Sequence, residues 1–142
     1  MNRLIFFLII ISFISCEKTT DYKRIIQNDS DYDIWIINPY YRALDSTNTF
    51  TECREIVLDS IAVARKTSYV LEVVNTNRSV DFHADCPFIC LDTLETRIHN
   101  RDSLRLNINL YPSDSNWVYT VFQEGEKGSC ECRLIITNSS IE

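Results

Sequence analysis

Apolar and polar residues alternate in two stretches of the C-terminal half of the chain. Every second residue of 104–111 is apolar, and 130–136 repeats this period with Cys130 and Cys132 on the apolar side. Because successive side chains of a strand point to opposite faces, both stretches are predicted to be strands with one buried face. Residues 117–123 are rich in aromatic and β-branched types, and 124–129 holds both glycines of the chain. We therefore expect a C-terminal hairpin with its turn at 124–129.

Further short apolar runs predict strands upstream. They cover 22–27, 32–38, 54–64, 68–75 and 94–99, with turns at 28–31, 65–67 and 100–102. No stretch keeps the 3.6-residue spacing of a helix for long, so we expect no helix beyond a turn or two. About seven or eight short strands at this spacing are typical of an all-β, antiparallel two-sheet sandwich with an immunoglobulin-like architecture. The long segment without a pattern, 76–91, is where loop chemistry is expected.

The acidic turn after the first predicted strand has part of the spacing of a calcium loop. Asp29, Asp31 and Asp33 alternate as the first ligands of such a loop do. Ile34 and Tyr40, however, stand where that loop needs glycine and a bidentate glutamate. We therefore expect a hairpin turn with solvated carboxylates.

The first fifteen residues have the composition of a secretory signal. Arg3 precedes eight consecutive apolar residues, a run too short to cross a bilayer stably. The segment ends in Ser15-Cys16, which resembles the lipobox of bacterial lipoproteins, although Phe13 stands where many lipoboxes have leucine. The resemblance implies a signal peptide at 1–15 and a lipidated tether at 16–21, which leaves 22–142 for the single β-sandwich domain that the strand pattern predicts. Acyl chains on Cys16 would hold the protein on a membrane, and no other cofactor is expected.

Composition narrows the function classes. The chain has 142 residues, with 14 Lys+Arg against 20 Asp+Glu and a formal net charge of −6, which suits one domain. An acidic balance argues against nucleic acid as a partner, because phosphate neutralisation needs a basic face. Only 2 glycines occur, which excludes a P-loop and a dinucleotide-binding fingerprint. No local catalytic signature is found, so we expect no enzyme.

Two further stretches carry a family resemblance. Residues 26–34 have the form I-x-N-x-S-x-Y-D-I, and 134–141 reads L-I-I-T-N-x-x-I. Together with the signal, these patterns make the chain similar to the small lipoproteins of Bacteroidota, many of which are known only as domains of unknown function. The resemblance implies an envelope lipoprotein, at the outer membrane and facing either the periplasm or the exterior, and it carries over no active site. Secreted proteins of that group are O-glycosylated at Asp-Ser/Thr before an apolar residue or Thr, a pattern that fits Ser46, Ser60, Thr93 and Ser103.

Beyond Cys16, five cysteines remain: Cys53, Cys86, Cys90, Cys130 and Cys132. An envelope location permits disulfides, so the structural interpretation is two bridges and one free thiol. The two cysteines of 130–132 lie about 6.5–7 Å apart on one strand, at the limit of bridging distance. We expect them to bond elsewhere, one of them with Cys86 or Cys90, which would fix the 76–91 loop to the C-terminal hairpin. The full connectivity stays open.

A metal site is the alternative interpretation of the same residues. It would use His83, Cys86, Cys90, Cys130 and Cys132, since thiolates and imidazole suit zinc or cuprous copper. The spacing of these ligands does not match the paired units of structural zinc sites, and a lone histidine in a loop is expected to be solvated. A third interpretation, a thiol-dependent enzyme, needs a cysteine with a lowered pKa.

Aromatic residues suggest a contact surface. Tyr40, Tyr41 and Arg42 follow a predicted strand and precede a polar loop, so they are candidates for binding sugar rings or a peptide. Trp35 and Trp117 lie within predicted strands and are expected in the core. The leading hypothesis is a non-catalytic, membrane-anchored binding or structural module with an envelope protein or a glycan as partner.

Overall fold

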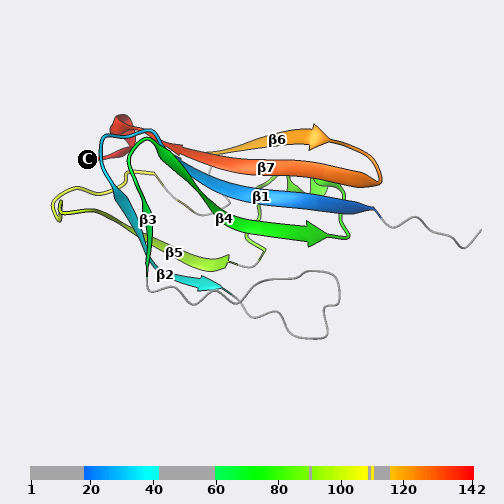
Figure 1. The fold of residues 1–142 in the computed structure, drawn as a ribbon, viewed down its shortest axis with the longest axis horizontal. Helices are drawn as coiled ribbons and strands as arrows, with labels where there is room; N and C mark the ends of the chain where they lie inside the picture. Colours follow the sequence, from blue (N-terminus) through cyan, green and yellow to red (C-terminus); the bar gives the residue numbers. More distant parts are fainter. Residues whose placement is uncertain (1–17, 42–59, 90, 109, 111–115) are drawn as a thin grey trace, which may run out of the picture.

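The computed structural model describes residues 18–41, 60–89, 91–108, 110 and 116–142, which form seven strands and two short 3-10 helices (Figure 1). The strands are β1 (Thr19–Asn28), β2 (Ile34–Tyr41), β3 (Ser60–Val63), β4 (Thr67–Thr76), β5 (Leu91–Ile98), β6 (Trp117–Gln123) and β7 (Lys127–Ile136). The helical turns are η1 (Val80–His83) and η2 (Asn138–Ser140). The expected all-β fold, with no helix beyond a turn or two, is confirmed for the described residues.

The strands form two sheets, as expected for a sandwich. The larger sheet has the order β4-β1-β7-β6, and the smaller has the order β3-β2-β5. One pairing departs from the antiparallel expectation, since β1 and β7 run parallel with Tyr22 opposite Cys130. Parallel neighbours need a long connection, and here almost the whole domain lies between the two strands. The first and last strands therefore begin at the same end of the sandwich (right in Figure 1).

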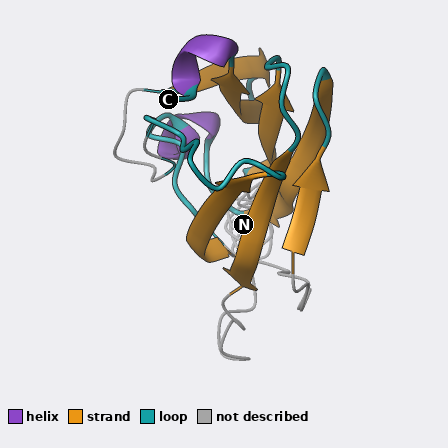
Figure 2. Ribbon diagram, turned by 90° about the vertical axis from the view of Figure 1, so that its left-hand side faces the viewer, coloured by secondary structure: helices purple, strands orange, loops and turns teal. Residues whose placement is uncertain are grey.

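Two of the predicted turns, 28–31 and 65–67, are crossovers between the sheets. The chain passes from β1 in the larger sheet to β2 in the smaller one, and from β3 in the smaller sheet to β4 in the larger one. The hairpin expected at 28–31 is therefore wrong, although a turn does form there. The carboxylates of Asp29 and Asp31 are exposed, as expected. Both crossovers lie at the end opposite the start of β1, and Figure 2 views the molecule from that end.

The most regular alternation in the sequence does not make a strand of a sheet. Within 104–108, the ladder is a single bridge between Leu106 and Ile141. Around it, the backbone N–H of Arg105 donates to Glu142 at 2.7 Å, and that of Asn107 donates to Ser140 at 3.0 Å. The apolar side of the segment still packs against the core, so the alternation reports burial correctly. Its partner is the segment after β7, where Ile141 follows the helical turn η2.

The core lies between the inward faces of the two sheets. On β7, the alternating residues Cys130, Cys132, Leu134 and Ile136 are all buried, as expected. β7 begins earlier than expected, so Gly128 lies in the strand rather than in the turn. A Cβ at this glycine would lie 2.7 Å from Val80 Cγ1 of η1, which explains the residue type there.

Candidate functional site

A cluster of buried polar groups occupies the centre of the sandwich. Arg24, fully buried on the inner face of β1, lies opposite Glu72 of β4, with its Nε 3.3 Å from the Glu72 carboxylate. Its Nη2 donates to the Tyr22 hydroxyl at 3.1 Å and to the Cys86 carbonyl. The guanidinium also lies 3.9 Å from the ring centre of Phe88. These contacts tie the segment after η1 to the larger sheet.

Burial sets the protonation states of this cluster. It lowers the pKa of Arg24 and raises the pKa of Tyr22 to about 12, because a low-dielectric interior disfavours the charged form of each group. The positive charge of Arg24 opposes the shift of Tyr22, and the nearby carboxylate of Glu72 opposes that of Arg24. Tyr22 is therefore a neutral phenol at ordinary pH. Since its groups are closed off from solvent, the cluster serves the fold rather than a ligand.

The expected bridge between the 76–91 loop and the C-terminal hairpin is present. Cys86 and Cys132 form a disulfide with a Cα–Cα distance of 5.6 Å. Cys130 is a free, buried cysteine, and burial raises the pKa of its thiol against the effect of a hydrogen bond from Tyr119. That direction is opposite to what a nucleophilic thiol needs. Cys16, Cys53 and Cys90 lie outside the described residues.

His83 is not solvated, contrary to expectation. Its ring is fully buried and stacks on Tyr22, with ring centres 4.5 Å apart. Its Nε2 lies 3.0 Å from the Thr76 hydroxyl oxygen. Burial lowers the pKa of His83 to about 4, which keeps the imidazole neutral near pH 7.

The described residues do not bring the alternative metal ligands together. Cys86 and Cys132 use their sulfurs in the disulfide, so neither is a thiolate ligand. No group of three or more histidine, cysteine or acidic side chains suited to a metal ion occurs in the described part of the chain. Of the five expected metal ligands, His83 and Cys130 are the two that the structure describes and that are not part of the disulfide.

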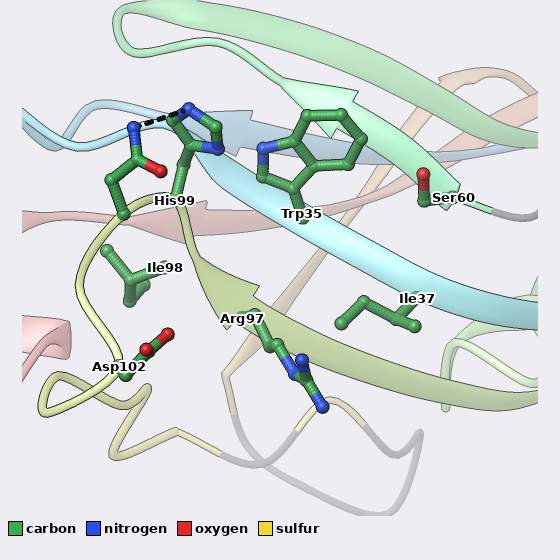
Figure 3. A pocket seen from close by; sticks show the side chains of 8 residues that line it. Trp35, Ile37, Ser60, Arg97, Ile98, His99 and Asp102 are labelled. Atoms are coloured by element: carbon green, nitrogen blue, oxygen red, sulfur yellow. Dashed lines mark hydrogen bonds between the residues drawn. The ribbon is translucent and has the colours of Figure 1, made fainter.

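A pocket lies on the outer face of the smaller sheet. Its volume is about 350 Å³, and its lining combines aromatic, charged, polar and aliphatic side chains (Figure 3). The lining residues are Trp35, Ile37, Ser60, Arg97, Ile98, His99, Asn100 and Asp102. This combination of an aromatic surface with several polar groups is what small-molecule sites use.

The strand register explains how these side chains meet. Trp35 of β2 pairs with Arg97 of β5, and Ile37 of β2 pairs with Ser60 of β3. Their neighbours Ile34 and Ile36 face the core, so the alternate positions of β2 face outwards. Trp35 is therefore only partly buried on the outer face, which corrects its assignment to the core. Trp117 is buried, as expected.

The turn after β5 completes the pocket. The His99 ring stacks on that of Trp35, with ring centres 5.6 Å apart and an angle of 29° between the planes. Asn100, which has a positive φ of 54°, places its amide nitrogen 2.9 Å from His99 Nε2 (Figure 3). The backbone N–H of His99 donates to Asp33 at 2.9 Å, which joins this turn to the crossover before β2. The pocket thus lies at the crossover end of the sandwich.

The other expected contact residues and modification sites are distributed as follows. Arg42 and Ser46 lie outside the described residues. Tyr40 and Thr93 are paired across β2 and β5, Tyr41 ends β2, and the side chains of these three are not described. Ser60 is partly buried in the pocket lining, and Ser103 is exposed in the turn after β5.

Sequence reasoning missed the pocket residues of β5 and its turn, which are Arg97, Ile98, His99, Asn100 and Asp102. No family model, curated protein or solved structure matches the chain. Among the described residues, no helix has the length and apolar character needed to span a membrane.

Proposed function

We propose that the chain is a non-catalytic binding module, anchored in the cell envelope by lipid on Cys16, and that it binds its ligand in the pocket of the β3-β2-β5 sheet. The anchor rests on the signal-like segment 1–15 and the Ser15-Cys16 pair that follows it. The Cys86–Cys132 disulfide supports a location outside the reducing cytoplasm.

The relative position of the start of β1 and the pocket is the observation that carries this proposal. β1 begins at Thr19, three residues after Cys16, so the strand takes up part of the segment expected to be a free tether. Its ten residues, at roughly 3.3 Å each, extend over about 30 Å. The chain then turns directly into β2, whose second residue is Trp35. A sandwich held by its N-terminal end would present the pocket on the side away from the membrane.

The state of the buried groups argues against a catalytic role for the interior of the sandwich. The cysteine, tyrosine and histidine of the interior are shifted towards their neutral forms, and none of them lies in the pocket lining. Catalysis by a thiol or an imidazole needs the opposite shift or direct access to a substrate. The pocket instead offers a partly exposed ring with polar groups around it, which suits recognition.

Fatty-acid labelling and fluorescence quenching test the proposal. The full-length chain is produced in a bacterium fed an alkyne fatty acid, and we expect label on the wild type and none on Cys16→Ala. A fluorophore is then attached to the lipidated protein through a non-cysteine handle, either at exposed Glu124, near the start of β7, or at exposed Ser103, near the pocket. Each protein is placed in vesicles whose lipid headgroups carry a quencher.

We expect strong quenching at position 124 and little at position 103, since the two lie at opposite ends of the sandwich. The pair is matched in exposure, so the comparison reports position alone. Absence of fatty acid on Cys16 would overturn the anchor. Equal quenching at the two positions would overturn the presentation of the pocket.

A further inference from the structure

We infer that the ligand of this pocket is a saccharide whose ring packs on the indole of Trp35. The inference rests on the proposed function, in which this pocket is the binding site. It is carried by two features of the lining: an aromatic surface made by two stacked rings, and a rim with both hydrogen-bond donors and acceptors.

The aromatic surface of the pocket is made by two stacked rings. The indole of Trp35 stacks with the ring of His99, whose centre is 5.6 Å away, and the amide nitrogen of Asn100 lies 2.9 Å from His99 Nε2. The C–H bonds on one face of a sugar ring carry partial positive charge, and the face of an aromatic ring carries partial negative charge. A ring held in place loses little conformational freedom on binding, which favours affinity.

The rim has the hydrogen-bonding capacity that sugar hydroxyls require. Arg97 only donates, the Asp102 carboxylate only accepts, and the Ser60 hydroxyl does both. Each sugar hydroxyl both donates and accepts, so a mixed rim can satisfy several of them. Arg97 attracts a phosphate group and Asp102 repels it, so the rim does not select for phosphate, and an alkyl chain would leave the polar groups of the rim without partners.

The size of the pocket limits the length of the saccharide. Its volume of about 350 Å³ is near the lower end of the range of roughly 300–1,000 Å³ that small-molecule sites occupy. We therefore expect recognition of one or two sugar units, such as the end of a longer glycan. A position at the crossover end leaves the pocket open to a glycan that approaches from outside the membrane.

The experiment is a binding screen on the full-length chain in detergent. The probes are an immobilised panel of mono- to tetrasaccharides, which includes neutral hexoses, amino sugars and uronic acids, together with phosphorylated sugars and short peptides. We expect binding to at least one class of unphosphorylated saccharide, and Trp35→Ala is expected to weaken it at least tenfold. Trp35→Phe, which keeps a ring, should recover part of the affinity.

Phe122→Ala is the matched control, because Phe122 is an aromatic residue exposed at 64% on the larger sheet. It should leave binding unchanged, and thermal unfolding will show whether each variant is folded. Saccharide binding that Trp35→Ala leaves intact would overturn the inference, as would the absence of any saccharide bound by the folded wild type. Binding of a peptide or a phosphorylated sugar alone, lost in Trp35→Ala, would overturn the saccharide assignment and leave the proposed binding pocket standing.

Discussion

The side-chain amide nitrogen of Asn28 lies 3.0 Å from the backbone carbonyl oxygen of Val63, and this hydrogen bond joins the two segments that cross between the sheets. The same nitrogen donates to Tyr32 at 2.7 Å. The amide oxygen accepts from the hydroxyl and the backbone N–H of Ser30, at 2.6 and 3.1 Å. Asn28 is fully buried, so its polar side chain exchanges water for a complete set of protein partners.

Replacement of Asn28 by alanine should therefore destabilise the fold strongly. The change removes four hydrogen bonds and leaves the carbonyls of Tyr32 and Val63 without this donor, the second of them in a buried position. We expect the free energy of unfolding to fall by roughly 3 kcal/mol, measured by urea denaturation. Asn75→Ala is the control, since Asn75 is exposed and hydrogen-bonded to exposed Asp21, and it should change stability by about 0.5 kcal/mol or less. Equal effects of the two variants would contradict the role given to Asn28.

Asn28 also shows which features of the fold a local sequence pattern can predict. The sequence around Asn28 predicts a turn because asparagine, aspartate and serine bond to nearby backbone, and a turn is found. Whether the chain pairs back with β1 or crosses to the other sheet depends on a contact with Val63, which is 35 residues away. Period-two alternation likewise predicted the buried face of β7 correctly. The same pattern predicted a strand over 104–111, but the described residues 104–108 form a single bridge, because alternation reports burial and not the presence of a pairing partner.

The disulfide, the buried ion pair and the pocket could be predicted from the sequence less completely than the strands. A bridge from Cys86 or Cys90 to the C-terminal hairpin followed from the limited reach of cysteines on one strand, and Cys86–Cys132 confirms it. The burial of Arg24 is not visible in a sequence, because charged residues are almost never fully buried without partners, and two of its partners, Glu72 and the Cys86 carbonyl, come from distant segments. The pocket depends on the pairing of Trp35 with Arg97 across 62 residues, which only the register reveals.

The buried ion pair gives a second prediction. Arg24→Met keeps much of the side-chain volume but leaves the buried carboxylate of Glu72 without the positive charge beside it. Loss of one partner of a buried pair costs about 3–5 kcal/mol, so we expect a fall of that size in the free energy of unfolding. The double variant Arg24→Met/Glu72→Gln should recover part of the loss, because no charge is then buried.

Arg133 provides the matched control for this prediction. It contacts Glu131 at 2.7 Å, but its side chain is 32% exposed on the outer face of the larger sheet. Arg133→Met should cost about 1 kcal/mol or less, as partly exposed pairs contribute little. If the double variant were no more stable than Arg24→Met, the loss would come from packing against Phe88 and Trp117 rather than from charge.

The disulfide gives a third prediction. Cys86 and Cys132 are separated by 46 residues, so the bridge restricts the unfolded chain considerably. By the loop-entropy relation, Cys86→Ala/Cys132→Ala should lower the free energy of unfolding by about 4 kcal/mol. Cys130→Ala, at a buried cysteine of the same strand, is the control and should cost about 1 kcal/mol.

Peptide mapping after alkylation checks the assignment behind that prediction. In the folded wild type, Cys130 should resist N-ethylmaleimide because its thiol is buried, and it should react fully after denaturation without reductant. Cys86 and Cys132 should be alkylated only after denaturation and reduction. Recovery of Cys130 in a disulfide-linked peptide would refute the pairing.

His83 makes the stability of the protein depend on pH in a definite direction. Its pKa in the folded state, about 4, is lower than the ordinary value of 6.5, because burial disfavours the imidazolium form. The unfolded chain therefore binds more protons at this residue, and the stabilising effect of the neutral ring is fully present above pH 6.5 and lost as the pH falls towards 4. The loss amounts to roughly 3 kcal/mol over that interval.

The variant His83→Phe keeps an aromatic ring beside Tyr22 and removes the titration. The difference in the free energy of unfolding between variant and wild type, measured by urea denaturation from pH 7.5 to 4, should therefore move in favour of the variant as the pH falls. Carboxylates such as Asp31, whose pKa is lowered by hydrogen bonds from Lys66 and Asn138, titrate in both proteins and cancel in this difference. A difference that stays constant across the whole range would mean that His83 takes up its proton within the folded protein, and the buried, neutral imidazole described above would then be wrong.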